Sequence, residues 1–220
     1  MEVRLIGISP NPEKIPAMAA LLTHSPSTPK ELEDQPEKKY QVVLDEVLKM
    51  GHTSVIEHTS FTFGISGVSR SLTHQLVRHR IASYAQQSQR YVSISEPTYV
   101  VPPTIKKNKA MNKAYENTMK KIWEEYNKLL SLDVPAEDAR YILPNATCTN
   151  IMVTMNARAL LNFFELRCCL HAQWEIRTLA NKMLNLVKKE APLIFKNAGA
   201  SCKTKNYCPE HNTECKWYPK

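Results

Sequence analysis

The sequence predicts an α+β fold, in which a mostly antiparallel sheet is flanked by helices, including one long helix. Residues 60–66 alternate apolar and small polar side chains with a period of two, which indicates a strand. Residues 106–132 instead keep apolar side chains three or four positions apart, the spacing of an amphipathic helix. No repeat and no linker divides the chain. We therefore expect a single compact domain over residues 1–200, followed by a cysteine- and histidine-containing tail at residues 201–220.

The other elements of the first half follow from short local patterns. The apolar run Val3–Ser9 predicts an opening strand. Thr28 directly before Pro29 is typical of a capped helix start. Apolar side chains share one face of Pro36–Met50, which predicts a helix that ends at Gly51.

The second half also contains both helices and strands. Its long helix carries a stripe of methionine and tyrosine side chains that we expect to pack in the core. The expected elements are a helix over Ser69–Arg78, a strand over Arg90–Ile94, a loop over Pro97–Pro103 ended by a Thr104 cap, a short helix over Ala136–Leu143, a strand over Thr147–Met155 and a helical region over Ala157–Ala191 that is broken near Cys168.

Composition narrows the partners without naming one. The net charge of +8, from 29 Lys plus Arg against 21 Asp plus Glu, favours nucleic acid, a membrane surface or phosphorylated metabolites. No apolar run approaches the roughly 20 residues that span a bilayer, and the start lacks the pattern of a signal peptide, so we expect a cytoplasmic protein. The five glycines assemble neither a Rossmann turn nor a P-loop, so side chains must hold any dinucleotide.

A basic segment is the most informative feature. Arg78, His79 and Arg80 are consecutive, so they cannot all lie on one solvated face. No Asp or Glu occurs between residues 65 and 95, and burying a guanidinium without a partner costs several kcal/mol, by rough estimate. The sequence therefore predicts a bound anion, which could also receive hydrogen bonds from Gln75, Ser88 and Arg90.

Three further segments hold groups with more than one interpretation. His52, Glu57 and His58 could form a metal site, or simply a capped connection with polar side chains. Arg158 and Asn162 are four residues apart and share a helix face, with Leu161 and Phe164 on another, and Arg167 and His171 repeat the offset. Ordinary pairing with Glu165 and Glu175 could also neutralise these arginines.

Taken in order, these segments resemble the motifs of the flavin-dependent thymidylate synthases. The blocks are G-H-x-S/T-x-x-E-H from Gly51, R-H-R-x-x-S followed by S-x-R from Arg78 to Arg90, A-R-Y-I-L-P around Arg140, and N-A-R-x-L-x-N-F-x-x-L-R from Asn156. They cover roughly residues 51–177. The chain departs from the family at Ala85 and Gln86, where Asn-Glu is usual, and Gln86 keeps a carbonyl acceptor but loses the charge.

The resemblance implies reductive methylation of dUMP to dTMP, with 5,10-methylenetetrahydrofolate as carbon donor, NADPH-reduced FAD as hydride donor and tetrahydrofolate as product. It also implies a homotetramer whose active sites are shared between subunits. The implied cofactor-binding residues are Ser54, Glu57, Arg78, His79, Arg80, Ile81, Asn156, Arg158, Asn162 and His171. The implied substrate-binding residues are Gln75, Arg78, Gln86, Gln87, Ser88, Gln89, Arg90, Arg140 and Arg167, and the implied catalytic residues are Arg167, Ser88, Arg78 and His52.

The six cysteines fall into two groups. Cys148, Cys168 and Cys169 lie within predicted strands or helices and are most simply buried thiols. The tail spaces its groups as Cys202-x5-Cys208-x2-His211-x3-Cys215, which fits a zinc site, a redox or free-thiol tail, or a nucleic-acid-binding knuckle. No cysteine has the P-C-H/Q setting of the other kind of thymidylate synthase. We expect no active-site metal and no cysteine nucleophile.

Two other functional classes compete with this interpretation. One is a flavoprotein unrelated to nucleotides, which the phosphate clamp of Arg90, Arg140 and Ser88 argues against. The other is a nucleic-acid-binding module that uses the net charge and the tail. Such a module would interleave aromatics with its basic residues, whereas the basic segment holds Tyr84 alone. We therefore expect neither a nucleic-acid nor a membrane partner.

Overall fold

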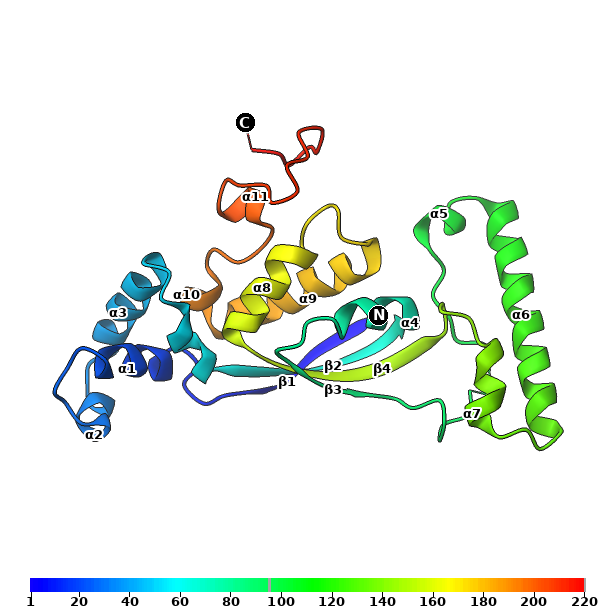
Figure 1. The fold of residues 1–220 in the computed structure, drawn as a ribbon, viewed down its shortest axis with the longest axis horizontal. Coiled ribbons are helices and arrows are strands. Elements are labelled where there is room, and N and C mark those ends of the chain that lie inside the picture. Colours follow the sequence, from blue (N-terminus) through cyan, green and yellow to red (C-terminus); the bar gives the residue numbers. More distant parts are fainter. Residues whose placement is uncertain (95, 220) are drawn as a thin grey trace. The chain divides into compact units, whose positions relative to one another are not determined.

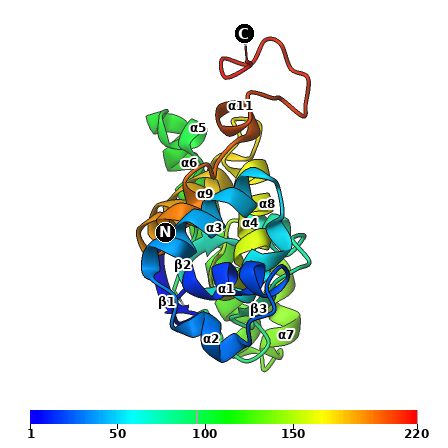
Figure 2. The ribbon, with the colours of Figure 1, turned by 90° about the vertical axis from the view of Figure 1, so that its left-hand side faces the viewer.

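The chain forms an α+β fold around a four-stranded sheet (Figures 1 and 2). The computed structural model describes residues 1–94 and 96–219. The strands are β1 (Glu2–Ile8), β2 (Ser60–Ser69), β4 (Cys148–Asn156) and β3 (Ser83–Gln86), in that spatial order. The antiparallel sheet, its many helices and the long helix α6 (Lys109–Ser131) confirm the predicted fold class. In the described part of the chain, no helix is both long and apolar enough to cross a membrane.

Backbone contacts divide the chain into two compact units. The first unit holds residues 1–2, 65–78 and 85–152. The second unit holds residues 3–64, 79–84 and everything from residue 153 onward. Each unit therefore draws on segments far apart in the sequence.

Aromatic side chains fill the centre of the second unit. The Phe195 ring meets the edges of Phe61 and Phe164, with ring centroids 5.4 and 6.0 Å away. The Glu13 carboxylate accepts hydrogen bonds from the backbone N–H groups of Leu193 (2.6 Å) and Ile194 (3.3 Å). The helices of this unit are α1 (Lys14–Leu22), α2 (Pro29–Glu33), α3 (Glu37–Lys49), η1 (Thr53–His58), α8 (Ala157–Arg167), α9 (Trp174–Glu190), α10 (Pro192–Phe195) and α11 (Ser201–Thr204).

The first unit buries one part of its long helix. Trp123 and Tyr126 are buried, and the Trp123 indole N–H donates to the Ile94 carbonyl at 3.0 Å. The predicted core stripe holds only in this part, because Met119 is buried whereas Met111 is 59% exposed. The other helices of this unit are α4 (Arg70–Leu76), α5 (Pro103–Lys106), α7 (Ala136–Ala139) and η2 (Arg140–Ile142).

Several predicted boundaries are confirmed. Thr28 and Glu31 form a reciprocal capping box at the start of α2. Gly51 follows α3 with φ of 78°, a conformation that favours glycine. The predicted break near Cys168 is the C-cap that separates α8 from α9.

Two predicted details are wrong. Residues 90–94 are not a strand; the strand is Ser83–Gln86, because the chain turns at Ser88, whose carbonyl accepts from the Val92 N–H at 3.1 Å. Thr104 is not a cap, because α5 already begins at Pro103. Asn108 caps α6 instead, with its side-chain oxygen accepting from the Met111 N–H at 3.0 Å.

Candidate active site

The helix α8 begins at a side-chain cap and presents one polar face. The Asn156 side-chain oxygen accepts from the Ala159 N–H at 2.8 Å, which satisfies one of the amides left open at a helix start. Leu160, Phe163 and Phe164 are fully buried on the opposite face. The predicted flavin ligand Asn156 thus also has a structural role.

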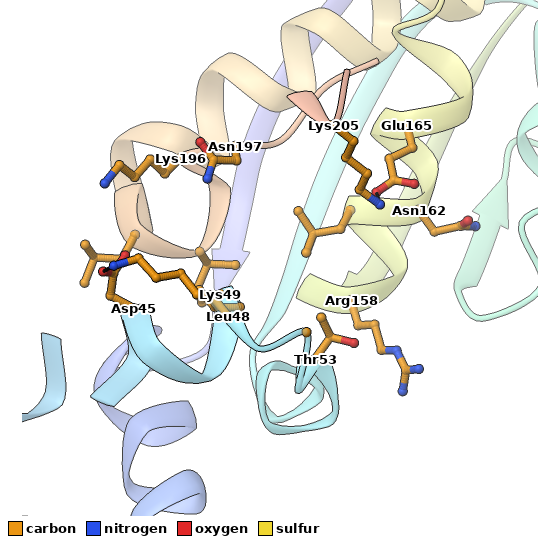
Figure 3. A pocket seen from close by; sticks show the side chains of 14 residues that line it. Asp45, Leu48, Lys49, Thr53, Arg158, Asn162, Glu165, Lys196, Asn197 and Lys205 are labelled. Carbon is orange, nitrogen blue, oxygen red and sulfur yellow. Dashed lines mark ion pairs between the residues drawn. The ribbon is translucent and has the colours of Figure 1, made fainter. Parts of the chain in front are cut away.

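A cavity of about 410 Å³ lies against the polar face of α8 (Figure 3). Arg158, Leu161, Asn162 and Glu165 line it, at the i, i+3, i+4 and i+7 positions of one helical stripe. Arg158 and Asn162 therefore share a face, as predicted. The placement of Leu161 on another face was wrong, because it lines the same cavity.

Cations outnumber acids in the wall of this cavity beside α8. Figure 3 shows Lys49 and Lys196 on the side of α3 and α10, and Arg158 and Lys205 on the side of α8. Asp45 and Glu165 are the carboxylates in the lining, which therefore holds four cations and two acids. Lys49 pairs with Asp45, and Lys205 pairs with Glu165. The excess positive charge favours an anionic ligand.

Arg158 makes its own ion pair with Glu57 at the end of η1. This contact joins two predicted cofactor-binding residues that are far apart in the sequence. The structure also corrects the alternative in which Glu165 neutralises Arg158, since Glu165 binds Lys205 instead. Ser54 of the same short helix and His52, its N-cap residue, have exposed side chains.

Arg167 and His79 form a hydrogen-bonded pair in the second unit. The Arg167 Nε–H donates to His79 Nε2 at 2.9 Å, so this ring nitrogen must be unprotonated. Burial, followed by the Arg167 charge, lowers the pKa of His79 to about 4. The Phe163 ring packs edge-on at 4.9 Å, and the Tyr84 hydroxyl donates to the His79 carbonyl at 2.8 Å. A neutral imidazole therefore orients a charged guanidinium.

The tail reaches the last predicted flavin ligand. The Asn212 amide nitrogen lies 2.7 Å from His171 Nε2. His171 and Arg167 also line a second cavity, of about 190 Å³, together with cysteines of α11 and the tail. No three His, Cys, Asp or Glu side chains among the described residues are placed to hold a metal ion, either here or at His52 and Glu57.

In the first unit, the predicted phosphate arginines meet at one residue. Arg90 Nε donates to the Glu137 carboxylate at 2.7 Å, and Arg140 Nε donates to the Glu137 carbonyl at 2.9 Å. The structure thus brings Arg90 and Arg140 together. It also shows that Arg90 does not require a bound anion, because a carboxylate from a distant segment supplies the partner.

The loop before Arg90 is held by hydrogen bonds within the same unit. Ser88 Oγ accepts from the Arg90 N–H at 3.1 Å, and Gln87 accepts from the Asn150 amide at 3.2 Å. Gln86 donates to the hydroxyls of Thr73 (3.1 Å) and Thr149 (3.4 Å). A glutamate at position 86 could not donate these bonds, which gives the departure from the family pattern a structural role.

Sequence reasoning missed Arg70. Its Nη2 donates to the Gln87 carbonyl at 3.1 Å, and it lines a small cavity with Ser88 and Gln89. Burial, followed by the charge of Arg140, lowers the pKa of Arg70. Its buried Nε has no hydrogen-bond partner among the described residues. No periodicity or motif marked this arginine, because its surroundings come from distant segments.

The remaining predicted residues surround these groups. Gln75 is half-buried on α4 and donates to the Ser71 carbonyl at 3.5 Å. Arg78 and Arg80 are exposed, so the expected burial of their guanidinium groups, on which the prediction of a bound anion rested, is wrong; Ile81 is 74% exposed. Exposed apolar and cationic side chains at this point leave the motif accessible to a ligand or another subunit.

The two groups of cations, one in each unit, suit anionic ligands. The chain matches the family model of the thymidylate synthase complementing protein over residues 4–193. It is 47% identical to a flavin-dependent thymidylate synthase of Clostridium tetani, over 98% of this chain and 93% of that one. It is 48% identical to another from Geobacter sulfurreducens, over 98% and 94%. The chain therefore belongs to the flavin-dependent thymidylate synthase family, as its motifs predicted.

A solved structure shares the fold. The UMP/dUMP methylase PolB of Streptomyces cacaoi, bound with 5-Br dUMP, superposes with a TM-score of 0.77 over 89% of this chain and 93% of that one. Its sequence identity is 23%, so the likeness concerns the fold.

The donor set of the cavity beside α8 fits FAD, the cofactor of this enzyme family. Guanidinium and ammonium groups suit a pyrophosphate, and the Asn162 amide suits ring or ribose oxygens. The apolar part of the wall can receive a planar ring; it consists of Leu48, Leu161, Leu193 and Ile194.

Proposed function

We propose that this chain reductively methylates dUMP to dTMP, using 5,10-methylenetetrahydrofolate as carbon donor and NADPH-reduced FAD as hydride donor, and releasing tetrahydrofolate. The observation that carries the proposal is the pairing of Arg167 with a neutral His79. Such a pair holds a full positive charge in a fixed orientation without neutralising it. A uracil that becomes electron-rich at C5 places negative charge on its carbonyl oxygens, which is where this guanidinium would act.

FAD, when bound, supplies the hydride chemistry, and the protein binds and orients the reactants. Arg158, Asn162, His171 and Glu57 are the side chains that would hold it, with Asn156 at the start of α8. Glu57 fixes Arg158 in place. His79, Arg80, Ser54 and Ile81 complete the proposed cofactor set.

Arg90, Arg140 and Ser88 would bind the phosphate of dUMP. Arg90 and Glu137 have half-exposed side chains (51% and 46%), and exposed ion pairs contribute only about 0–1 kcal/mol. A phosphate dianion can therefore displace the Glu137 carboxylate from Arg90. Ser88 Oγ accepts the Arg90 N–H, which keeps the loop in register. Gln75, Arg78, Gln86, Gln87 and Gln89 complete the proposed nucleotide set, and His52 lies at the start of η1.

Cys168 is not suited to act as a thiolate nucleophile. Burial raises the pKa of Cys168 to about 12, so this thiol stays protonated at neutral pH. In the proposed mechanism, charge stabilisation by Arg167 and Arg78 activates the uracil. We also propose a homotetramer with shared active sites, since Arg78, Arg80 and Ile81 are exposed in the chain.

Tritium release from dUMP labelled at C5 tests the proposal directly. Purified protein receives labelled dUMP, 5,10-methylenetetrahydrofolate, NADPH and FAD, and each component is omitted in turn. We expect release only with the complete mixture, together with one dTMP per tritium released. A variant with all six cysteines changed to serine should keep a measurable rate. Tritium release without dTMP, or complete loss of activity in a folded cysteine-free variant, would contradict the mechanism.

A further inference from the structure

Three thiols share the second cavity of the second unit. Cys169 follows the C-cap of α8, Cys202 lies in α11 and Cys208 lies in the tail, and all three line the cavity of about 190 Å³. Their side chains are half-buried. A small reagent can therefore reach a group of thiols that the proposed reaction does not use.

Cys202 lies within electrostatic range of the other thiols. Burial raises its pKa, and the neighbouring thiol groups raise it further, Cys169 most, then Cys208 and Cys215. Among the thiols that act on Cys202, Cys169 has the largest influence. These residues come from different segments, so folding has gathered them.

The arrangement differs from both a core thiol and a metal centre. Cys168 is a core thiol, 4% exposed, whereas Cys169 and Cys202 face a cavity. Within the described residues, no three cysteine or histidine side chains are placed around a point that could hold a metal ion. The cysteines are also not paired in disulfides. Two half-buried thiols that line one cavity fit a pair that can be oxidised to a disulfide.

Oxidation of these thiols would affect residues of the proposed active site. Arg167 and His171 line the same cavity, and Asn212 of the tail contacts His171 Nε2 at 2.7 Å. A covalent link between the tail and the turn after α8 would restrict this segment beside His171.

We propose that Cys169 and Cys202 are an oxidisable pair, which forms a reversible disulfide with a small-molecule disulfide as oxidant and fastens the tail to the turn after α8. Cys169 and Cys202 take no part in the proposed catalytic steps, although Arg167 and His171 line the same cavity, so the disulfide can be tested without assuming the identity of the methylated substrate.

The exchange balances with glutathione disulfide as the co-reactant. The Cys169 thiolate attacks one glutathione sulfur, which breaks the S–S bond and releases one glutathione thiolate. The Cys202 thiolate then attacks Cys169 Sγ, releases the second glutathione and forms the protein disulfide. Two protein thiols are oxidised, one glutathione disulfide is reduced to two glutathiones, and the two cysteine protons pass to the released thiolates.

The test is a titration of the full-length protein with glutathione disulfide, followed by alkylation and non-reducing peptide mass spectrometry. We expect two of the six thiols to be lost, with one cross-linked peptide pair joining Cys169 to Cys202, and dithiothreitol should restore both thiols. In Cys169→Ser and in Cys202→Ser, that cross-link should be absent, and a glutathione adduct should remain on the other cysteine.

Cys148→Ser serves as the matched control, because Cys148 lies in the first unit. It should form the cross-link like the unchanged protein. The proposal is overturned if all thiols survive the titration, or if the cross-link joins other cysteines such as Cys208 and Cys215. It is equally overturned if the purified protein carries one zinc ion per chain whose removal is needed before these thiols react.

Discussion

The two units present their cations in different ways. In the first unit, Arg90 and Arg140 meet at a half-exposed Glu137 beside an irregular loop. In the second unit, Arg158 projects from a capped helix, and Arg167 is held by a half-buried neutral His79. The proposed substrate residues lie mostly in the first unit, and the proposed cofactor residues lie mostly in the second. The Arg158–Glu57 pair is as exposed as the Arg90–Glu137 pair (54% and 43% against 51% and 46%), so the units differ in how they support the arginines and not in the exposure of these ion pairs.

Arg167 offers the strongest test of this division, because it lies in the second unit but is proposed to serve the substrate. We expect Arg167→Ala to lower kcat for tritium release by about a hundred-fold or more, since preorganised charge acts on the transition state. Flavin absorbance near 450 nm per chain should change little. Arg167→Lys should recover only part of the rate, because an ammonium group cannot match the oriented guanidinium. If both variants lost flavin to the same extent, Arg167 would be a cofactor-binding residue and not a substrate residue.

Arg90 tests the proposed role of the first unit in substrate binding. We expect Arg90→Ala to weaken dUMP binding by about ten- to a hundred-fold, through loss of a charge-assisted hydrogen bond to phosphate, while flavin binding is unchanged. Isothermal titration with dUMP and with deoxyuridine separates the phosphate contribution from that of the base.

Glu137→Gln is the matched counterpart, because it removes the competitor for Arg90 and leaves the backbone carbonyl that holds Arg140. It should bind dUMP slightly more tightly than the unchanged protein. Weaker binding in this variant would show that Glu137 orients Arg90 for the substrate.

Arg158 provides the corresponding test of cofactor binding in the second unit. Arg158→Ala should weaken FAD binding by about ten-fold, as expected for loss of one charged contact. The affinity for dUMP should stay within about two-fold of that of the unchanged protein. Fluorescence titration of apoprotein with FAD measures the first quantity. Arg177→Ala provides a control on another helix of the same unit, where the side chain binds the Leu170 carbonyl. A larger effect on dUMP than on FAD would contradict the division.

Asn156 separates capping from ligand binding. Asn156→Ala should destabilise the protein by about 1 kcal/mol, because α8 loses its N-cap acceptor. Asn156→Ser should restore most of the stability, measured by chemical unfolding of the protein without flavin. If Asn156 also binds FAD, the serine variant should keep its stability and lose affinity. A serine variant with unchanged FAD affinity would limit Asn156 to its structural role.

A pH dependence of stability is expected from His79. Its pKa is lowered in the folded state to about 4, from the usual 6.5, so the unfolded chain takes up a proton more readily. The stabilising contribution is therefore fully present above pH 6.5 and is lost as the pH falls from 6.5 toward 4. His79→Gln should reduce this loss in thermal melts, since glutamine does not titrate. If His79→Gln left the pH dependence of stability unchanged, groups other than His79 would cause that dependence.

Local patterns in the sequence predicted the elements whose signals are local. The Thr28 cap, the Gly51 stop and the break near Cys168 each depend on neighbouring residues, and each was confirmed. The predicted strand at residues 90–94 failed because pairing depends on a partner strand, and β4 pairs with Ser83–Gln86 instead. The helix α1 was missed because its short apolar run lacks clear periodicity.

The sequence by itself determined the family, the helical face shared by Arg158 and Asn162, and the set of residues proposed for the site. These follow from residue types at fixed spacings along one chain. Only the tertiary structure decided which charges are paired, which ring is neutral and which thiols meet: Glu137 with Arg90, His79 with Arg167, and Cys169 with Cys202 around one cavity. Electrostatic energies depend on distance and burial, and chain folding sets both between segments that are remote in sequence.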